Sequence, residues 1–202
     1  MKKIQLVNVS TLRPFRWLYQ SKGASYIWLV ARLWLGYKWL DAGWQKMFGA
    51  EYSSFWNGGK GVAGFATSAQ AHSTGAHASV VYGWWVSFMT NFVGPNHAII
   101  AKLVTLGELA IGLGLIIGLF TGVAAFFGVG LNIMYLLSGT IGVNPIYLLI
   151  GVFLIFAWQN AGNLGADRYV LPYLLERRTN QYDVDVAKII STPQTKEAAT
   201  QK

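Results

Sequence analysis

Residues 98–120 read AIIAKLVTLGELAIGLGLIIGLF, and this stretch decides what kind of protein the chain can form. Only Lys102 and Glu108 place an ionisable group in a run of apolar and small side chains. A helix needs about 20 mostly apolar residues to cross a bilayer core of roughly 30 Å. The stretch meets that requirement, so we expect it to form a membrane-spanning helix.

Further stretches satisfy or approach the same length criterion. Residues 25–47 carry a few isolated charges, whereas the runs 122–137 and 145–158 are apolar but short. The aromatic stretch 80–93 is too short to cross, and its Trp84 is typical of a membrane interface. The sequence therefore predicts an all-α integral membrane four-helix bundle, with a re-entrant or interfacial helix between its first two helices.

The composition excludes several other classes of protein. The chain is 53% hydrophobic and 12% charged, about half the charged share of a typical soluble domain. A disordered chain would be poor in aromatic residues, but here they make up 15%. Because the chain has no Cys, it offers no disulfide, no reactive thiol and no Cys-held iron–sulfur cluster.

The distribution of charge predicts an orientation in the cell membrane. Residues 1–23 contain basic and no acidic side chains, and basic residues also follow the last apolar stretch. Positive charge collects on the cytoplasmic side, so we expect four spans with both termini cytoplasmic. The expected organisation is a cytoplasmic arm (1–23), a membrane domain (24–175) and a polar, flexible tail (176–202). The net charge of +8 is then explained by topology rather than by nucleic acid.

Two charged residues stand out because they fall inside expected spans. Arg32 and Glu108 are both placed near the middle of the bilayer by the rise of 1.5 Å per helical residue. Unpaired charges there cost several kcal/mol, so we expect a buried ion pair between Arg32 and Glu108. Such a pair is either a structural clasp or a charged site for substrate or protons, and the sequence leaves both open.

The first span also carries an ordered stripe on one face. Spacings of 4, 3, 4 and 3 residues bring five side chains together on a helix: Arg32, Gly36, Trp39, Gly43 and Lys46. The stripe is either a packing surface with an interfacial lysine at its end or room for a ligand. Asp41 falls on the opposite face, one turn after Lys38, and Trp44 shares that broad side.

The remaining polar residues give weaker signals. Asn132 lies within the third apolar stretch and requires a hydrogen-bond partner, either another helix or a ligand. The histidines (His72, His77 and His97) lie outside the four expected spans, which argues against an intrinsic haem. We expect no metal site and no flavin, and the small polar segment 64–81 is expected to be a surface loop.

At this point the motifs resemble a known family. The stretches RLWLGYKWLDAGWQKMFG (32–49), GELAIGLGLIIGLFTG (107–122) and NAGNLGADRYVLP (160–172) resemble the DoxX/DoxD membrane proteins. The elements FWNGGKGVAGF (55–65) and GWWVSFM (83–89) make the chain more similar to the DoxD branch, the large subunit of thiosulfate:quinone oxidoreductase. The resemblance covers roughly residues 24–175.

The resemblance implies an oxidoreductase that converts thiosulfate to tetrathionate and passes electrons to a quinone. The implied partners are the lipid bilayer and a small DoxA-like subunit, with a homo-oligomer left open. Plain DoxX proteins instead support redox or oxidative-stress complexes, so a non-catalytic membrane subunit or scaffold is the alternative. Without Cys, any sulfur–sulfur coupling must occur between substrates or on a partner.

The expected site has two parts, because Arg32 and Lys46 are separated by roughly 21 Å along a helix. The residues that match the family pattern are Arg32, Gly36, Gly43, Lys46, Glu108 and Asp167. The deeper, catalytic part, where a quinone head group would exchange protons, is expected at Arg32, Glu108 and Asn132. The anion would be admitted and bound nearer the outer face by Lys46, Trp39, Trp44 and Asp41.

Overall fold

A computed structural model describes residues 17–19, 21–74, 80 and 82–174 of the chain. Every regular element in these ranges is helical, which confirms the all-α prediction at the level of secondary structure. Most of the expected N-terminal arm and the whole of the expected tail, 176–202, lie outside the described residues. The chain divides after Asp167, and the described residues 168–174 are helical.

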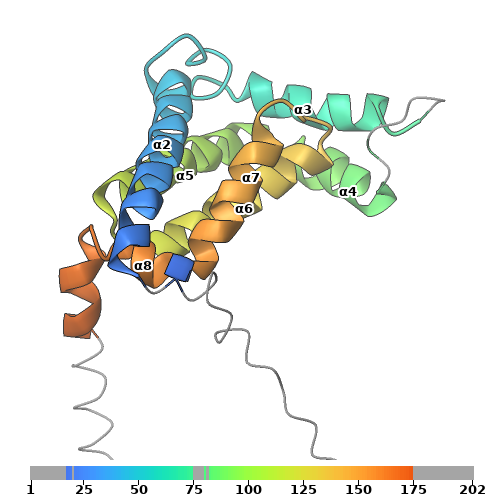
Figure 1. Cartoon of the computed structure of the whole chain (residues 1–202). Helices are drawn as coiled ribbons and strands as arrows, with labels where there is room; N and C mark the ends of the chain where they lie inside the picture. Colours follow the sequence, from blue (N-terminus) through green and yellow to red (C-terminus); the bar gives the residue numbers. More distant parts are fainter. Residues whose placement is uncertain (1–16, 20, 75–79, 81, 175–202) are drawn as a thin grey trace, which may run out of the picture. The chain divides into compact units, whose positions relative to one another are not determined.

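The principal helices of the first unit pack side by side (Figure 1). They are α2 (Lys22–Met47), α5 (His97–Ile117), α6 (Thr121–Leu137) and α7 (Asn144–Phe156). The helix α2 packs on α5, α5 on α6, and α6 on α7, while α7 returns to α2. The short helix α8 (Trp158–Gly162) closes one end against α2 and α6.

Glycines fix how α2 and α5 lie against each other. A Cβ added to Gly36 would stand 3.0 Å from the side chain of Leu115, and one added to Gly43 would stand 2.8 Å from that of Leu109. Small residues let two helices approach this closely. The two helices are therefore staggered, because α2 residues 36–43 face α5 residues 109–116.

The stagger leaves one half of each helix free to pack elsewhere. The first turns of α5 contact α3, and α2 contacts α8 at the other end of the unit. On α2 the stripe predicted from sequence faces inward, with Arg32, Gly36, Trp39 and Gly43 all buried. The packing interpretation of the two glycines is thus confirmed.

A second group of helices lies across the end where α2 stops and α5 begins (Figure 1). It contains α3 (Lys60–Ala71), α4 (Gly83–Phe88) and the π-helical turn η2 (Met89–Val93). The expected loop at 64–81 is wrong for residues 64–71, which form the second half of α3. Ala66 and Ala69, spaced three residues apart, bury the inner face of this helix, so its small side chains serve packing.

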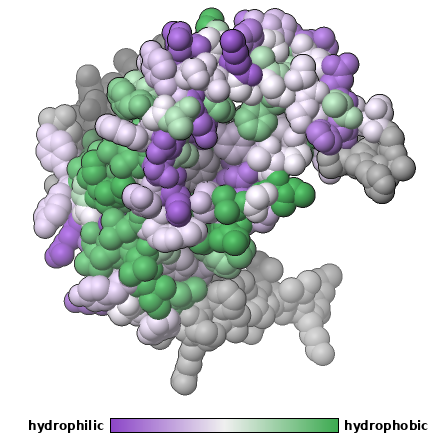
Figure 2. Space-filling view, turned by 90° about the horizontal axis from the view of Figure 1, so that it is seen from above, coloured by the Kyte–Doolittle hydropathy of each residue, from purple (hydrophilic) through white to green (hydrophobic). Residues whose placement is uncertain are grey.

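Polar groups lie inside and large apolar groups outside. Glu108, Arg32 and Asn132 are each 1% exposed, whereas Phe126 and Phe127 on α6 are at least 60% exposed. Figure 2 shows apolar side chains gathered in broad patches on the face it presents. Water disfavours this pattern and a lipid environment favours it.

Length and composition single out α5 among the described helices as able to cross a membrane. The helices α6 and α7 are apolar but shorter, and α2 is long but contains three charged residues in its interior, Arg32, Lys38 and Asp41. The number of spans and the orientation of the termini remain predictions.

One amide ties the start of α2 to α8. The side-chain nitrogen of Asn160 donates to the carbonyl oxygens of Leu18 (3.1 Å) and Ser21 (3.2 Å). The Ser25 hydroxyl donates to the amide oxygen of the same Asn160. Segments more than 130 positions apart in sequence are thereby joined at one end of the unit.

Candidate functional site

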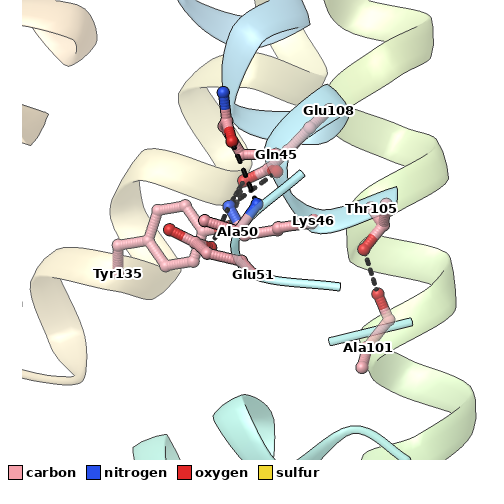
Figure 3. A network of polar contacts seen from close by, with 8 residues as sticks. All are labelled: Gln45, Lys46, Ala50, Glu51, Ala101, Thr105, Glu108 and Tyr135. Atoms are coloured by element: carbon pink, nitrogen blue, oxygen red, sulfur yellow. Dashed lines mark hydrogen bonds and ion pairs between the residues drawn. The ribbon is translucent and has the colours of Figure 1, made fainter. Parts of the chain in front are cut away.

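Three polar side chains from three helices meet in the structure (Figure 3). Lys46 Nζ lies 3.0 Å from Glu108 Oε1 and 2.8 Å from Oε2, so it bonds to both carboxylate oxygens. The Tyr135 hydroxyl donates to Glu108 Oε1 at 2.6 Å. We call Lys46, Glu108 and Tyr135 the carboxylate network.

The fold brings these residues together through the stagger of α2 and α5. Because Leu109 faces Gly43, Glu108 lies opposite the last turn of α2, which carries Lys46. Tyr135 stands in the last turn of α6, which packs on α5. The network therefore lies at the end of the bundle that α3 and α4 cover.

The network is buried but connects to the surface. Glu108 is 1% exposed and the Lys46 side chain 12%, so the ion pair is largely removed from water. A buried carboxylate is tolerated when a cation and further donors pair with it, and here both are present. Lys46 Nζ also lies 4.0 Å from Glu51, whose side chain is 51% exposed. A chain of ionisable groups thus leads from water to Glu108.

An apolar pocket adjoins the carboxylate network. Its volume is about 200 Å³, and aromatic residues including Phe55, Phe65 and Trp85 contribute to its lining together with Tyr135. The ammonium group of Lys46 stands 5.0 Å from the centre of the Phe55 ring, so both ends of the network touch the pocket wall. Ser138 also lines the pocket and accepts a hydrogen bond from Trp85 Nε1 at 3.2 Å. The pocket is therefore apolar, and the two residues of its lining that carry a hydroxyl group, Tyr135 and Ser138, use that group in hydrogen bonds within the protein.

Arg32 does not pair with Glu108, so that prediction is wrong. Its Nη2 donates to the carbonyl oxygen of Leu164 at 3.3 Å. The guanidinium group packs against Gly118 and Gly165, where an added Cβ would overlap Nη1. Arg32 Nε and Nη1 make no hydrogen bond within the described residues.

The stagger explains the error. Arg32 and Glu108 were expected at the same depth in the membrane because residues were counted from the ends of stretches 25–47 and 98–120. That count assumes that the ends of the two helices are level with each other. In the structure the α2 position that faces Glu108 is about 12 residues beyond Arg32, or roughly 18 Å along the axis. Arg32 instead faces the C-terminal end of α5, where the negative end of the helix dipole favours a cation.

Asp167 organises the same end of the bundle. Its carboxylate accepts hydrogen bonds from the backbone nitrogens of Phe120 (2.6 Å) and Thr121 (2.8 Å), at the start of α6. Its own backbone nitrogen donates to Gly118 at 2.8 Å. Asp167 is therefore a helix-capping residue, and the match to the family pattern at this position has a structural explanation.

Asn132 and Trp39 lie in the core between the two ends. Both are buried, and neither the amide of Asn132 nor Trp39 Nε1 makes a hydrogen bond within the described part of the chain. A Cβ on Gly128, one turn before Asn132, would lie 3.3 Å from Trp39 Nε1. Trp39 was expected near the outer face, but the structure places it in the middle of the bundle.

Trp44 and Asp41 lie apart from the carboxylate network. Trp44 is 55% exposed and packs on Phe48, with ring centroids 4.7 Å apart. Asp41 is also exposed, and among the described residues it forms no ion pair with Lys38, one turn before it. Lys38 instead stands over the ring of Tyr37. Of the predicted site residues, the structure brings Lys46 and Glu108 together.

Sequence reasoning missed Tyr135, although a signal was present. Tyr135 follows Asn132 by three positions, so both side chains share one face of α6. A phenol on the same face as a buried amide predicts a second polar group in the core. Among the described residues no group of three or more His, Asp or Glu side chains could hold a metal ion.

Comparison with protein families gives a match to the DoxX model over residues 27–140, more than half of the 202 residues. The chain belongs to the DoxX family. The matched DoxX region contains the whole carboxylate network and Arg32, and it ends before Asp167. DoxX proteins are membrane-associated, which agrees with the apolar exterior. Comparison with curated proteins and with solved structures finds no match.

Proposed function

We propose that this DoxX protein is the membrane subunit of a thiosulfate:quinone oxidoreductase and that a quinone head group is reduced beside Tyr135. The observation that carries the proposal is the position of Tyr135. Its ring lines the apolar pocket, while its hydroxyl lies 2.6 Å from a buried carboxylate. An apolar pocket with a proton-exchanging group at its edge suits a flat, apolar molecule that takes up protons when reduced.

The chemistry requires a proton source at the quinone. Two thiosulfate ions that join through a new sulfur–sulfur bond give tetrathionate and release two electrons. The quinone takes up those two electrons with two protons and becomes the quinol. Because the chain has no Cys, the sulfur–sulfur bond forms between substrate molecules or on a partner subunit.

The carboxylate network supplies the protons in this proposal. The Tyr135 hydroxyl passes its proton to the quinone oxygen, and the Lys46 ammonium group replaces that proton through Glu108. Lys46 regains its proton from water by way of Glu51, and two such transfers supply the two protons that one quinone takes up. Lys46 orients the carboxylate through two hydrogen bonds and links it to Glu51 at the surface. Since Lys46 already carries a carboxylate partner, we assign it to this network and not to the thiosulfate dianion.

We further propose that α2, α5, α6 and α7 all span the membrane with both termini cytoplasmic. The exposed apolar side chains of all four helices support this. In that orientation α2 runs outward, and the carboxylate network and Glu51 lie toward the outer face. Glu51 would then exchange protons with water on the side opposite the chain termini.

The test is quinone reduction by the purified full-length protein in lipid nanodiscs, with thiosulfate, sulfite and sulfide supplied in parallel. We expect thiosulfate to support turnover and Glu108→Gln to lower it about 100-fold, the usual contribution of a general acid or base. Lys46→Met should show a similar loss. Lys60→Met, which removes an exposed lysine at the start of α3, should leave the rate unchanged.

The alternative is a non-catalytic DoxX subunit that supports a redox complex, and one observation is compatible with it. The carboxylate network joins α2, α5 and α6, and a purely structural clasp would have the same contacts. In that case wild-type protein would reduce no quinone, with or without a small DoxA-like subunit. Glu108→Gln would then still co-purify with a redox partner.

A further inference from the structure

A second hollow lies on the outer surface of the bundle between α5 and α6. It is a groove of about 620 Å³, and every side chain that lines it is apolar or small. On α5 the lining runs from Leu103 to Ile117, a length of about 21 Å along the helix. Gly107 and Ala110 form part of its floor, where small side chains leave the space open.

The groove adjoins the pocket beside Tyr135. Val104 of α5 and Leu131 of α6 line both hollows, so these two side chains form a shared wall. Leu131 lies over Gly107, where an added Cβ would stand 3.9 Å from its Cδ1. The apolar pocket therefore continues, past one layer of side chains, into a long apolar groove on the lipid-facing side.

We propose that this groove holds the prenyl chain of a long-tailed quinone whose head group occupies the pocket beside Tyr135. The inference rests on the proposed function for the head group and adds the class of quinone: one with an isoprenoid tail, entering sideways from the bilayer between α5 and α6. Val104 and Leu131 mark the point where head group and tail join.

The shape of the two hollows favours a flexible chain as occupant. A helix with its side chains is about 10 Å across and would cover the groove without reaching the pocket. A prenyl chain is narrow, apolar and branched, so it fits a groove that has no polar lining and leads to a pocket of about 200 Å³. The position of the groove beside the pocket thus argues for one ligand that occupies both.

The test compares a decyl-substituted benzoquinone with the same benzoquinone lacking the chain. Binding to the full-length protein in nanodiscs is followed by quenching of Trp85 fluorescence, because Trp85 lines the pocket. Trp85→Phe identifies the signal that belongs to the pocket, and empty nanodiscs correct for partition into lipid. This measurement needs no electron donor, so it is independent of thiosulfate oxidation.

Gly107→Phe fills the groove and leaves the pocket open. We expect it to weaken binding of the decyl quinone about tenfold, or about 1.4 kcal/mol, and to change binding of the tailless quinone less than twofold. Gly130→Phe on α6 is the matched control, because an added Cβ there meets nothing within 4 Å and Gly130 lines neither hollow. If Gly107→Phe does not fold, Ala110→Phe places the same ring in the groove.

Each outcome decides a different point. If wild type binds both quinones and the groove-filling variants weaken the binding of both equally, or of neither, the groove does not hold the tail. The assignment of the head group to the pocket then stands. If wild type binds neither quinone, both assignments fall. If both quinones bind as expected but thiosulfate drives no turnover, the groove is supported and the electron donor in the proposed function is wrong.

Discussion

Each end of the helical bundle holds a cation of α2 that is largely removed from water, and the two cations are held in different ways. At one end Lys46 is paired with a carboxylate through two hydrogen bonds and adjoins a pocket. At the other end Arg32 donates to the carbonyl oxygen of Leu164 and packs against two glycines. At the first end ionisable side chains bond directly to one another, whereas at the second end Arg32 and Asp167 each bond to backbone groups near the ends of helices.

This difference shows which buried charge suits proton chemistry. Side-chain groups such as Glu108 and Tyr135 can gain and lose protons, but backbone carbonyl groups cannot. A guanidinium group also stays protonated in proteins, so Arg32 is suited to holding helix ends together. We therefore assign activity to the Lys46 end and stability to the Arg32 end, and the variants below test that division.

The largest expected effect comes from breaking the ion pair. Glu108→Leu leaves Lys46 with Glu51, 4.0 Å away, in place of its two hydrogen bonds to Glu108, and should lower the free energy of unfolding by about 3 kcal/mol. The double variant Glu108→Leu with Lys46→Leu should recover most of that stability without recovering quinone reduction. Thermal unfolding followed by circular dichroism measures the first quantity. If the double variant regains quinone reduction, the pair of Lys46 and Glu108 has a structural role only.

The next effect belongs to the opposite end. Gly118 has a φ of +70°, and a Cβ there would overlap the guanidinium group of Arg32. We expect Gly118→Ala to cost about 2 kcal/mol of stability, from backbone strain and from overpacking together. Quinone reduction per folded molecule should stay at the wild-type level. Gly130→Ala is the control for stability, and a specific loss of activity in Gly118→Ala would return Arg32 to the reaction.

A smaller effect is expected from the phenol. Tyr135→Phe keeps the ring in the pocket wall and removes the hydroxyl that donates to Glu108. Quinone reduction should fall about tenfold, which corresponds to about 1.4 kcal/mol. Tyr37→Phe changes an exposed tyrosine of α2 and should not alter the rate. If Tyr135→Phe and Tyr37→Phe reduce quinone at the same rate, Tyr135 does not donate protons to the quinone.

The smallest effect is expected at the cap of α6. Asp167→Asn replaces the charged group that accepts from Phe120 and Thr121 and should lower stability by about 1 kcal/mol. Asp41→Asn, at an exposed carboxylate on α2, should leave the unfolding temperature unchanged. A loss of stability equal to that of Gly118→Ala would mean that Asp167 also holds Arg32 in place.

Local patterns predicted the helices well because they depend on neighbours in sequence. The spacing of Gly36 and Gly43 identified the inner face of α2, and the apolar run 98–120 identified α5, observed as His97–Ile117. The helix α3 was missed because Ala and Gly carry little hydrophobic signal. Its buried positions are nonetheless spaced by four and three residues, at Val62, Ala66 and Ala69.

The pairing of side chains could not be predicted in the same way. Which residue meets Glu108 depends on the stagger of α2 against α5, and that stagger is set by contacts such as Gly43 on Leu109. A shift of about 12 residues, or roughly three helical turns, exchanges one partner for another while leaving every local pattern intact. Tyr135 required knowledge of a third helix as well. The polar residues of the site were therefore recognisable, but their partners were not.

The hydrogen bonds of Asn160 have a consequence for chain connectivity. The amide bonds to the backbone at Leu18 and Ser21, so the entry of the helical unit is held against α8, the short helix that precedes its end at Asp167. The chain could therefore connect the helices in a different order without changing how the helices pack. A circularly permuted chain, with a short linker across this junction and new ends opened at the turn containing Gly58, would retain every helix-to-helix contact of the bundle.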